Sequence, residues 1–164
     1  MKIFHGSAAL AAGALALLLA GSAFSETGGV VVDKAWVRAY PPGIQVTAAY
    51  MVVKNTSDQP AVLVGISCSD FAKTEIHETV QHQGQAHMQA VKELAIPAHG
   101  EVVLKPGGHH LMLIAPQKDT RPHAGDRMTL TLTFKDGKNV PVQAVVRKDA
   151  EGKPAAGEHS QHAH

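Results

Sequence analysis

The sequence predicts an all-β protein, either an antiparallel sandwich or a barrel, and two observations support this. From about Val30 to Arg147, short runs rich in Val, Leu, Ile and Thr alternate with turn residues such as Gly, Pro, Asn and Asp. No segment of this region keeps a helical period over several turns. Short strands at regular spacing with Gly and Pro turns are typical of antiparallel sandwiches and barrels.

The first expected strands are separated by clear turn residues. Val30–Arg38 ends before Pro41-Pro42-Gly43, and the next strands are Gln45–Lys54, Val62–Ser67, Thr74–Val80 and Ala86–Val91. Gly, Pro, Asn and Asp favour turns because they supply a positive φ, a fixed φ or a local hydrogen bond. The aromatic residues of this region and of the last strands are expected in the core, namely Trp36, Tyr50, Phe71 and Phe134.

The remaining expected strands follow the same pattern. Glu101–Leu104 leads into Pro106-Gly107-Gly108 and His109–Ala115, and Lys135-Asp136-Gly137 separates Arg127–Phe134 from Val140–Arg147. Apolar and threonine residues alternate along Arg127–Phe134. This alternation predicts a strand with one buried face.

Composition and charge exclude several classes of protein. The 164 residues include 15 Lys and Arg against 14 Asp and Glu, so the net charge of +1 gives no basic face for nucleic acid or for an acidic membrane surface. A single cysteine excludes an internal disulfide framework, a thiolate zinc cluster and a CxxC redox pair. Histidine is in excess, at 11 residues.

The two ends of the chain differ in composition from the region of expected strands. Residues 1–25 are interpreted as a secretory signal peptide, cleaved near Ala23 or Ser25, because Lys2 precedes a small-apolar run that is short for a membrane span. No cysteine lies at the cleavage region, which argues against a lipid anchor there. Residues 26–148 form the expected domain, and 149–164 an expected disordered tail. The predicted location is the periplasm.

Histidine and methionine come together between residues 77 and 112. In a strand, residues i and i+2 share a face, so His110 and Met112 project together. If Gln83-Gly84 is the loop of a hairpin, His77 and Met88 also share a face, whereas a three-residue loop without a bulge separates them. The sequence leaves this register open.

The chemistry of imidazole and thioether side chains indicates which metal they would bind. Thioethers bind Cu(I) well, whereas Zn²⁺, Mg²⁺ and Ca²⁺ call for carboxylates or more imidazole. A set of two imidazoles and two thioethers also needs no free thiol, which suits an oxidising compartment.

The spacing of these residues resembles a known signature. His77, Met88, His110 and Met112 reproduce the His-x10-Met-x21-His-x-Met motif of the periplasmic copper chaperone family called PCuAC. Composition alone gives this spacing with a probability on the order of one in a thousand. The resemblance extends over Ala35–Ala39, Pro41-Pro42-Gly43, Ala48–Met51 and Pro106-Gly107-Gly108.

The resemblance implies a fold, a ligand set and partners. The fold would be a cupredoxin-like antiparallel Greek-key β-sandwich, and one Cu(I) ion would be bound by His77, Met88, His110 and Met112, with His87 as an auxiliary ligand. Members of the family are associated with copper delivery to the CuA centre of cytochrome c oxidase. The expected partners are therefore a CuA subunit, a Sco-type thioredoxin-like protein, or both.

The C-terminal segment carries a second candidate site. His159, His162 and His164 lie close together in the sequence. Imidazole and backbone nitrogen suit Cu(II), so the segment is a candidate Cu(II) site.

Three alternative functions compete with copper delivery. An enzyme is disfavoured because no GxSxG occurs and Cys68 has no activating neighbour. A blue-copper electron carrier needs a Cys–His–Met loop near its C-terminus, which Cys68 does not supply. A copper-sequestering resistance protein would use the same ligands as a chaperone and stays open.

Overall fold

The computed structural model describes residues 25–27, 29–40, 43–117 and 122–148, and all regular structure in them is β-strand. Among these residues no helix is long and apolar enough to span a membrane. Apart from Ser25, the predicted signal peptide lies outside the described residues, as does the predicted tail. The strands are β1 Ser25–Thr27, β2 Val30–Arg38, β3 Val46–Asn55, β4 Ala61–Ser67, β5 Phe71–His82, β6 Gln85–Ala90, β7 Leu94–Ile96, β8 Glu101–Leu104, β9 His109–Pro116, β10 Arg127–Phe134 and β11 Asn139–Arg147.

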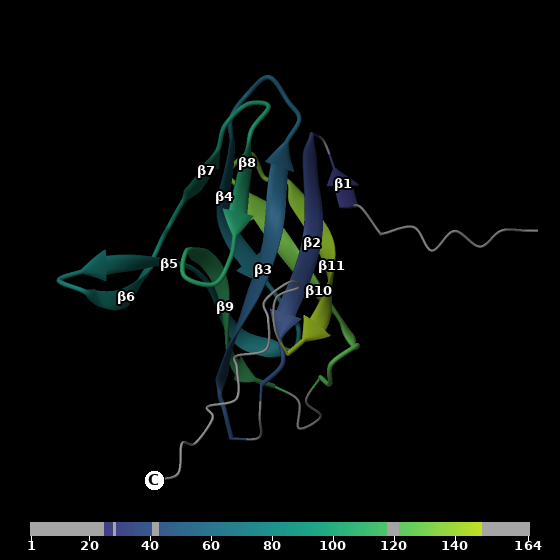
Figure 1. The fold of residues 1–164 in the computed structure, drawn as a ribbon. Helices are drawn as coiled ribbons and strands as arrows, with labels where there is room; N and C mark the ends of the chain where they lie inside the picture. The colour runs from purple at the N-terminus through teal and green to yellow at the C-terminus, as the bar shows by residue number, and fades with distance from the viewer. Residues whose placement is uncertain (1–24, 28, 41–42, 118–121, 149–164) are drawn as a thin grey trace, which may run out of the picture.

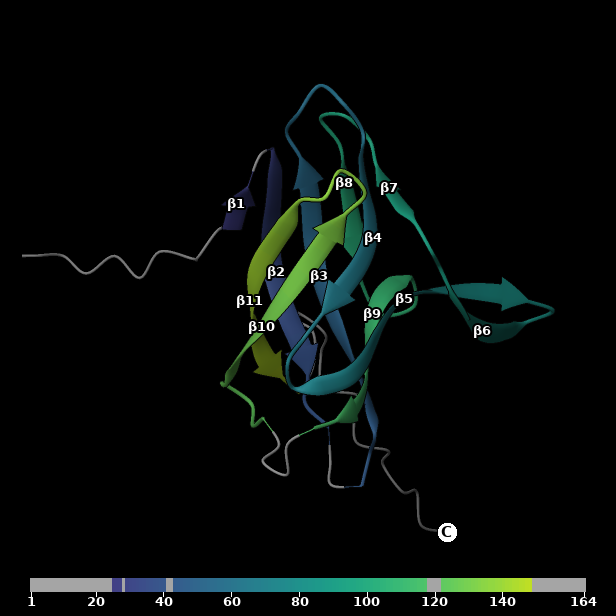
Figure 2. The ribbon, with the colours of Figure 1, turned by 180° about the vertical axis from the view of Figure 1, so that it is seen from behind.

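The strands form one continuous sheet that curls into two layers. Their order is β6-β5-β9-β3-β2-β11-β10-β4-β7, with β1 added to β2 and β8 to β3. One layer, with β2, β3, β8 and β9, faces the viewer in Figure 1, and β4, β10 and β11 face the viewer in Figure 2. The predicted all-β sandwich is confirmed. Its pairs are antiparallel except for β2 and β11, which run parallel where the sheet passes between layers.

The core lies between the two layers and follows the alternation of the strands. On β10 the apolar residues Met128, Leu130, Leu132 and Phe134 are buried, and the threonines between them are not. Leu111 and Leu113 of β9 are 0% exposed and enter the same core. Because one face of β9 packs in the core, the side chains on its other face are available to form a site.

The edge of β3 is shared by two successive strands. β8 pairs with its C-terminal half and β9 with its N-terminal half. The turn of residues 105–108 connects β8 to β9 and is closed by hydrogen bonds from Lys105 N–H to His109 O and from Gly108 N–H to Lys105 O. β9 then continues to pair with β5, and the β5–β6 hairpin projects from the body (Figures 1 and 2).

Candidate metal centre

The site begins with β9, whose outer face carries His110 and Met112. Their neighbours in the chain, Leu111 and Leu113, are fully buried in the core, so the alternation predicted for this strand is confirmed. His110 is nevertheless only 5% exposed, because β3 and β5 flank β9 on both sides. An imidazole is therefore held on a central strand, where its position is well determined.

The β5–β6 hairpin has the two-residue loop. Thr79 is paired with Met88 and His77 with Ala90, and Gln83 and Gly84 have φ values of 50° and 79°. Positive φ at both loop residues is the mark of a type I′ turn, whose twist matches that of the strands. His77 and Met88 therefore share a face of the hairpin as diagonal neighbours.

The pairing of β5 with β9 brings the two halves of the site together. His77 lies directly opposite His110, and their ring centroids are 5.9 Å apart. Met112 lies opposite Glu75 on β5 and opposite Ala48 on β3. We call this surface, which carries His77, Met88, His110 and Met112, the site face.

Hydrogen bonds determine which nitrogen of each imidazole is free to bind a metal ion. His77 Nε2 lies 2.9 Å from Glu75 Oε2, and His110 Nδ1 lies 2.9 Å from the carbonyl oxygen of Gly108. These oxygens accept, so the ring nitrogens donate, and the lone pairs remain on His77 Nδ1 and His110 Nε2. His77 Nδ1 is buried and has no hydrogen-bond partner. A buried acceptor without a partner is costly unless something binds it, and a metal ion is one such group.

Glu75 is held as a carboxylate. Its Oε1 lies 2.8 Å from Lys73 Nζ, while its other oxygen accepts from His77. The hydrogen bond from Lys73, followed by the one from His77, holds the pKa of Glu75 below its ordinary value. The carboxylate therefore remains available to orient His77. The sequence motif does not include Glu75, although its position two residues before His77 on the same strand face is a usable signal.

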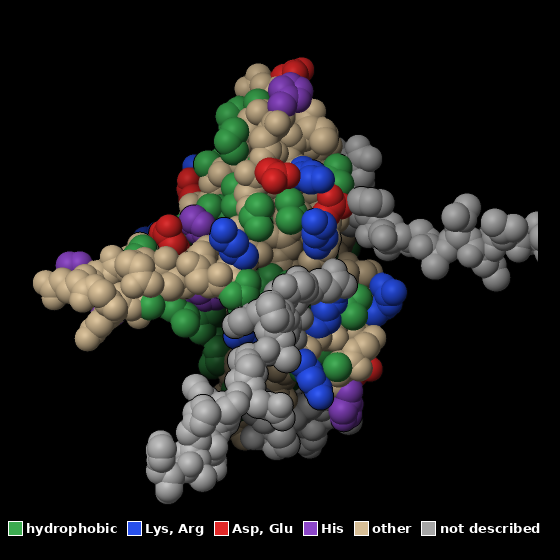
Figure 3. All heavy atoms as spheres, viewed as in Figure 1, with side chains coloured by type: hydrophobic (Ala, Val, Ile, Leu, Met, Phe, Trp, Pro, Cys, Tyr) green, Lys and Arg blue, Asp and Glu red, His purple; other side chains and the backbone are tan. Residues whose placement is uncertain are grey.

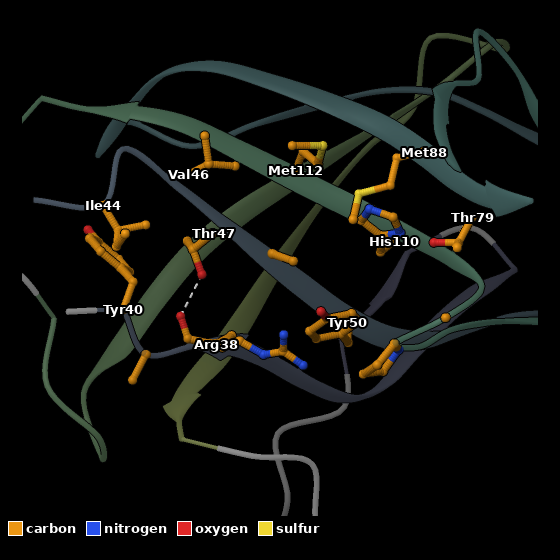
Figure 4. A pocket seen from close by; sticks show the side chains of 14 residues that line it. Arg38, Tyr40, Ile44, Val46, Thr47, Tyr50, Thr79, Met88, His110 and Met112 are labelled. Atoms are coloured by element: carbon orange, nitrogen blue, oxygen red, sulfur yellow. Dashed lines mark hydrogen bonds between the residues drawn. The ribbon is translucent and has the colours of Figure 1, made fainter. Parts of the chain in front are cut away.

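The methionines and His110 line one pocket of about 370 Å³ (Figure 4). Met88 reaches it from β6 and is 65% exposed, whereas Met112 on β9 is only partly exposed. His77 does not line this pocket but lies beside His110 on the neighbouring strand. The structure thus places three of the four predicted residues around one pocket and the fourth next to it.

The donor atoms available here restrict the metal. In the part of the chain that the structure describes, no group of three or more His, Cys, Asp or Glu side chains is placed to hold an ion. The thioethers of Met88 and Met112, which line the pocket with His110, are therefore candidates for further donors to an ion held by the two imidazoles. Two neutral nitrogens and two thioethers fit Cu(I) better than a hard divalent ion.

An aromatic and apolar wall completes the pocket. Tyr50 and Arg38 line the pocket, and the Arg38 guanidinium carbon lies 5.5 Å from the Tyr50 ring centre. Trp36 does not line the pocket, but its ring packs against that of Tyr50 at a tilt of 32°, with centroids 4.5 Å apart. Ile44 and Val46 are exposed at the rim. Trp36 and Tyr50 are buried as expected, but on the outer face of β2 and β3, not in the sandwich core.

The other histidines lie away from this arrangement. His87 pairs with Val80, so its side chain lies on the opposite face of the hairpin from Met88. His99 is bonded to Asp58, at 2.7 Å, and His109 lies 3.5 Å from Glu78. His123 is exposed in a loop near Asp126. His159, His162 and His164 lie outside the described residues.

Comparisons of the sequence with known proteins agree on one family. The LpqE-like family, described as "Putative lipoprotein LpqE-like", matches residues 30–146. A relative from Leifsonia xyli subsp. xyli (strain CTCB07), named "Putative lipoprotein Lxx21020", is 41% identical over 128 residues. That alignment covers 77% of this chain and 74% of the relative.

Solved structures agree with the fold. The solution structure of CuI-DR1885 from Deinococcus radiodurans is 37% identical, has a TM-score of 0.60 and is matched over 74% of this chain and 80% of that one. The copper-bound PCuAC domain from PmoF2 has a TM-score of 0.65 at 25% identity, over 78% of this chain and all of that domain. The expected cupredoxin-like fold is confirmed, and the chain belongs to the LpqE-like family.

Proposed function

We propose that this protein is a periplasmic copper chaperone that binds one Cu(I) ion through His77, Met88, His110 and Met112. The observation that carries the proposal is His77 Nδ1, a buried acceptor without a partner, on a strand directly opposite His110. Two thioethers are presented on the same site face, from β6 and β9. The similarity to structures described as copper-bound supports copper as the cargo.

Each residue has a distinct role in holding and releasing the ion. The Glu75 carboxylate and the Gly108 carbonyl accept hydrogen bonds from the ring N–H groups and leave one nitrogen lone pair on each imidazole for copper. Met112 on the central strand β9 would supply a fixed thioether. Met88, at 65% exposure, would supply the thioether that an incoming acceptor reaches first. Release would then proceed by exchange of an exposed ligand without opening the fold.

The proposed acceptor is the CuA subunit of a cytochrome oxidase or a Sco-type thioredoxin-like protein. An acceptor that binds copper through thiolates would hold Cu(I) more tightly than thioethers do. Transfer from a His–Met site to such an acceptor is therefore downhill. The tail residues His159, His162 and His164 are proposed as a separate Cu(II) site. His87 is not included among the ligands of the Cu(I) ion, since its strand pairing turns it away from the site face.

The test is an anaerobic Cu(I) titration followed by X-ray absorption spectroscopy. We expect one tightly bound ion with two nitrogen and two sulfur neighbours. A shell without sulfur would overturn the proposed ligand set. To separate a chaperone from a copper-sequestering protein, the loaded protein is mixed with an apo CuA domain. Transfer within minutes supports a chaperone, and retention of copper supports sequestration.

A further inference from the structure

The β5–β6 hairpin presents a second group of histidines on the face that points away from the copper pocket. Val80 is paired with His87, and His82 with Gln85, so His82 and His87 are diagonal neighbours on that face. Their ring centroids are 6.5 Å apart, and both side chains are exposed. Figure 3 shows histidine side chains, in purple, along the projecting hairpin.

His82 and His87 differ from the other histidines of the described residues because no hydrogen-bond acceptor of the protein lies beside their rings. His77, His99, His109 and His123 each lie near a carboxylate, and His110 is bonded to a backbone carbonyl. Within the described ranges of the chain, no carboxylate or carbonyl contacts the ring of His82 or His87, and the two rings contact each other. Both rings can therefore present a nitrogen lone pair to an ion.

The spacing suits chelation by two imidazoles. A metal–nitrogen bond is about 2.0 Å long, so two imidazoles on one ion have ring centres within roughly 6 Å of each other. The observed 6.5 Å reaches this range when the exposed side chains change rotamer, with no movement of the backbone. The two-residue turn and the strand pairing place His82 and His87 as diagonal neighbours whenever the hairpin is formed.

The chemistry of this face differs from that of the site face. It offers imidazole and no thioether, because Met88 lies on the other side of β6. Imidazole pairs with open positions for water suit divalent ions of the first transition row, and among these Cu²⁺ binds most tightly.

We propose that His82 and His87 form a separate binding site for a divalent transition metal, with Cu²⁺ preferred, on the hairpin face opposite the proposed Cu(I) site. The hairpin would then present a soft donor set on one face and an imidazole pair on the other. This inference does not depend on the ligand set proposed for Cu(I), since the two sites share no residue.

The test is NMR spectroscopy of the full chain with substoichiometric Cu²⁺, which broadens the amide signals of residues close to the ion. His82→Gln, His87→Gln and the double variant are compared with wild type. The matched control is His123→Gln, which removes an exposed histidine from a distant loop. Cross-strand contacts between Thr79 and Met88 show in each variant that the hairpin is intact.

We expect selective broadening around residues 80–87 in wild type and in His123→Gln, and its loss in each single variant. The double variant should show no further loss, because one imidazole alone cannot chelate. Broadening by an ion at the tail or at the site face would persist in His82→Gln and His87→Gln. That outcome, or no selective broadening of the hairpin, would overturn the proposal.

Discussion

At the scale of single residues, the sulfur atoms of Met88 and Met112 test the proposed Cu(I) site. Met→Leu conserves volume and apolarity, so each variant should cost less than about 1.5 kcal/mol of unfolding free energy, and Met88→Leu least because it is exposed. Each removes a soft donor and should weaken Cu(I) far more than Cu(II). Competition with a chromophoric chelator measures the affinity. Wild-type Cu(I) affinity in both variants would show that the thioethers are only structural.

Glu75 provides a second test at this scale, because it acts through His77. Glu75→Ala removes the acceptor for His77 Nε2 and should weaken Cu(I) binding by about 10- to 100-fold. Glu75→Gln keeps a carbonyl oxygen in place and should restore part of the affinity. Glu78→Gln is the matched control, since Glu78 lies near His109 and not His77. Equal affinities in Glu75→Ala and Glu78→Gln would exclude the positioning role.

Tyr50 predicts how stability changes at alkaline pH. Burial raises the pKa of its phenol, and this outweighs the opposite effect of Arg38. The folded state therefore favours the protonated phenol. The stability that this group contributes is present below its unfolded pKa of about 10 and is lost as the pH rises through the folded value. Urea unfolding between neutral pH and pH about 11 should show a smaller loss of stability in Tyr50→Phe than in wild type. Equal losses of unfolding free energy in wild type and Tyr50→Phe would show that the Tyr50 phenol does not cause the alkaline destabilisation.

At the scale of elements, strands with a strong pattern could be located from the sequence. Val30–Arg38, Glu101–Leu104 and Arg127–Phe134 have the predicted bounds. β1 and β7 were missed because three residues are too few to show alternation. The positions of Trp36 and Tyr50 on the outer face of β2 and β3 could not be predicted either. Both faces of these strands carry apolar residues, and the pattern alone does not tell which face is inside.

The turn of the β5–β6 hairpin explains why the sequence did not determine the pairing register of these two strands. Gln83 adopts a positive φ that Asn or Gly usually takes, so the loop lacks the common signature. Gly84 has a φ of 79° with nothing near its Cβ position, so Gly84→Val strains the turn by about 1–2 kcal/mol without a clash. This strain favours a longer loop, which shifts the pairing of β5 with β6 by one residue, moves Met88 off the site face and should weaken Cu(I) binding.

The β10–β11 turn supplies a matched control for that change. Gly137 has a φ of 86° and equally open surroundings. Gly137→Val should lower the unfolding free energy by a similar amount and leave Cu(I) affinity unchanged. Gln83→Asn, which creates the favoured Asn-Gly turn, should keep or raise the affinity. Equal effects of the two glycine variants on copper binding would show that the hairpin register does not matter.

At the scale of the whole molecule, the four candidate ligands come from segments that only the folded sheet brings together. The spacing in the sequence identified them, because the resemblance carried the positions of His77 and Met88 as well as those of His110 and Met112. What the sequence could not supply was the environment: the Gly108 carbonyl and the Glu75 carboxylate meet the imidazoles only once β5 and β9 are paired. The candidate ligands can thus be identified from the sequence, whereas the orientation of their side chains depends on the folded sheet.

This arrangement predicts that copper changes the dynamics of one part of the fold. β6 is exposed along its whole length, and among the described strands it pairs with β5 alone, so the apo hairpin should open locally with little cost to the core. A Cu(I) ion bound by Met88 together with His110 and Met112 would tie β6 to β9. Amide hydrogen exchange of residues 85–90 should therefore slow on Cu(I) loading, while exchange in β10 and β11 changes little. Acidification should reverse the effect, because protonated imidazoles cannot bind the ion. In Met88→Leu the copper-dependent protection should disappear even where the ion still binds. If that protection remained, the tie between β6 and β9 would have to come from a donor other than Met88.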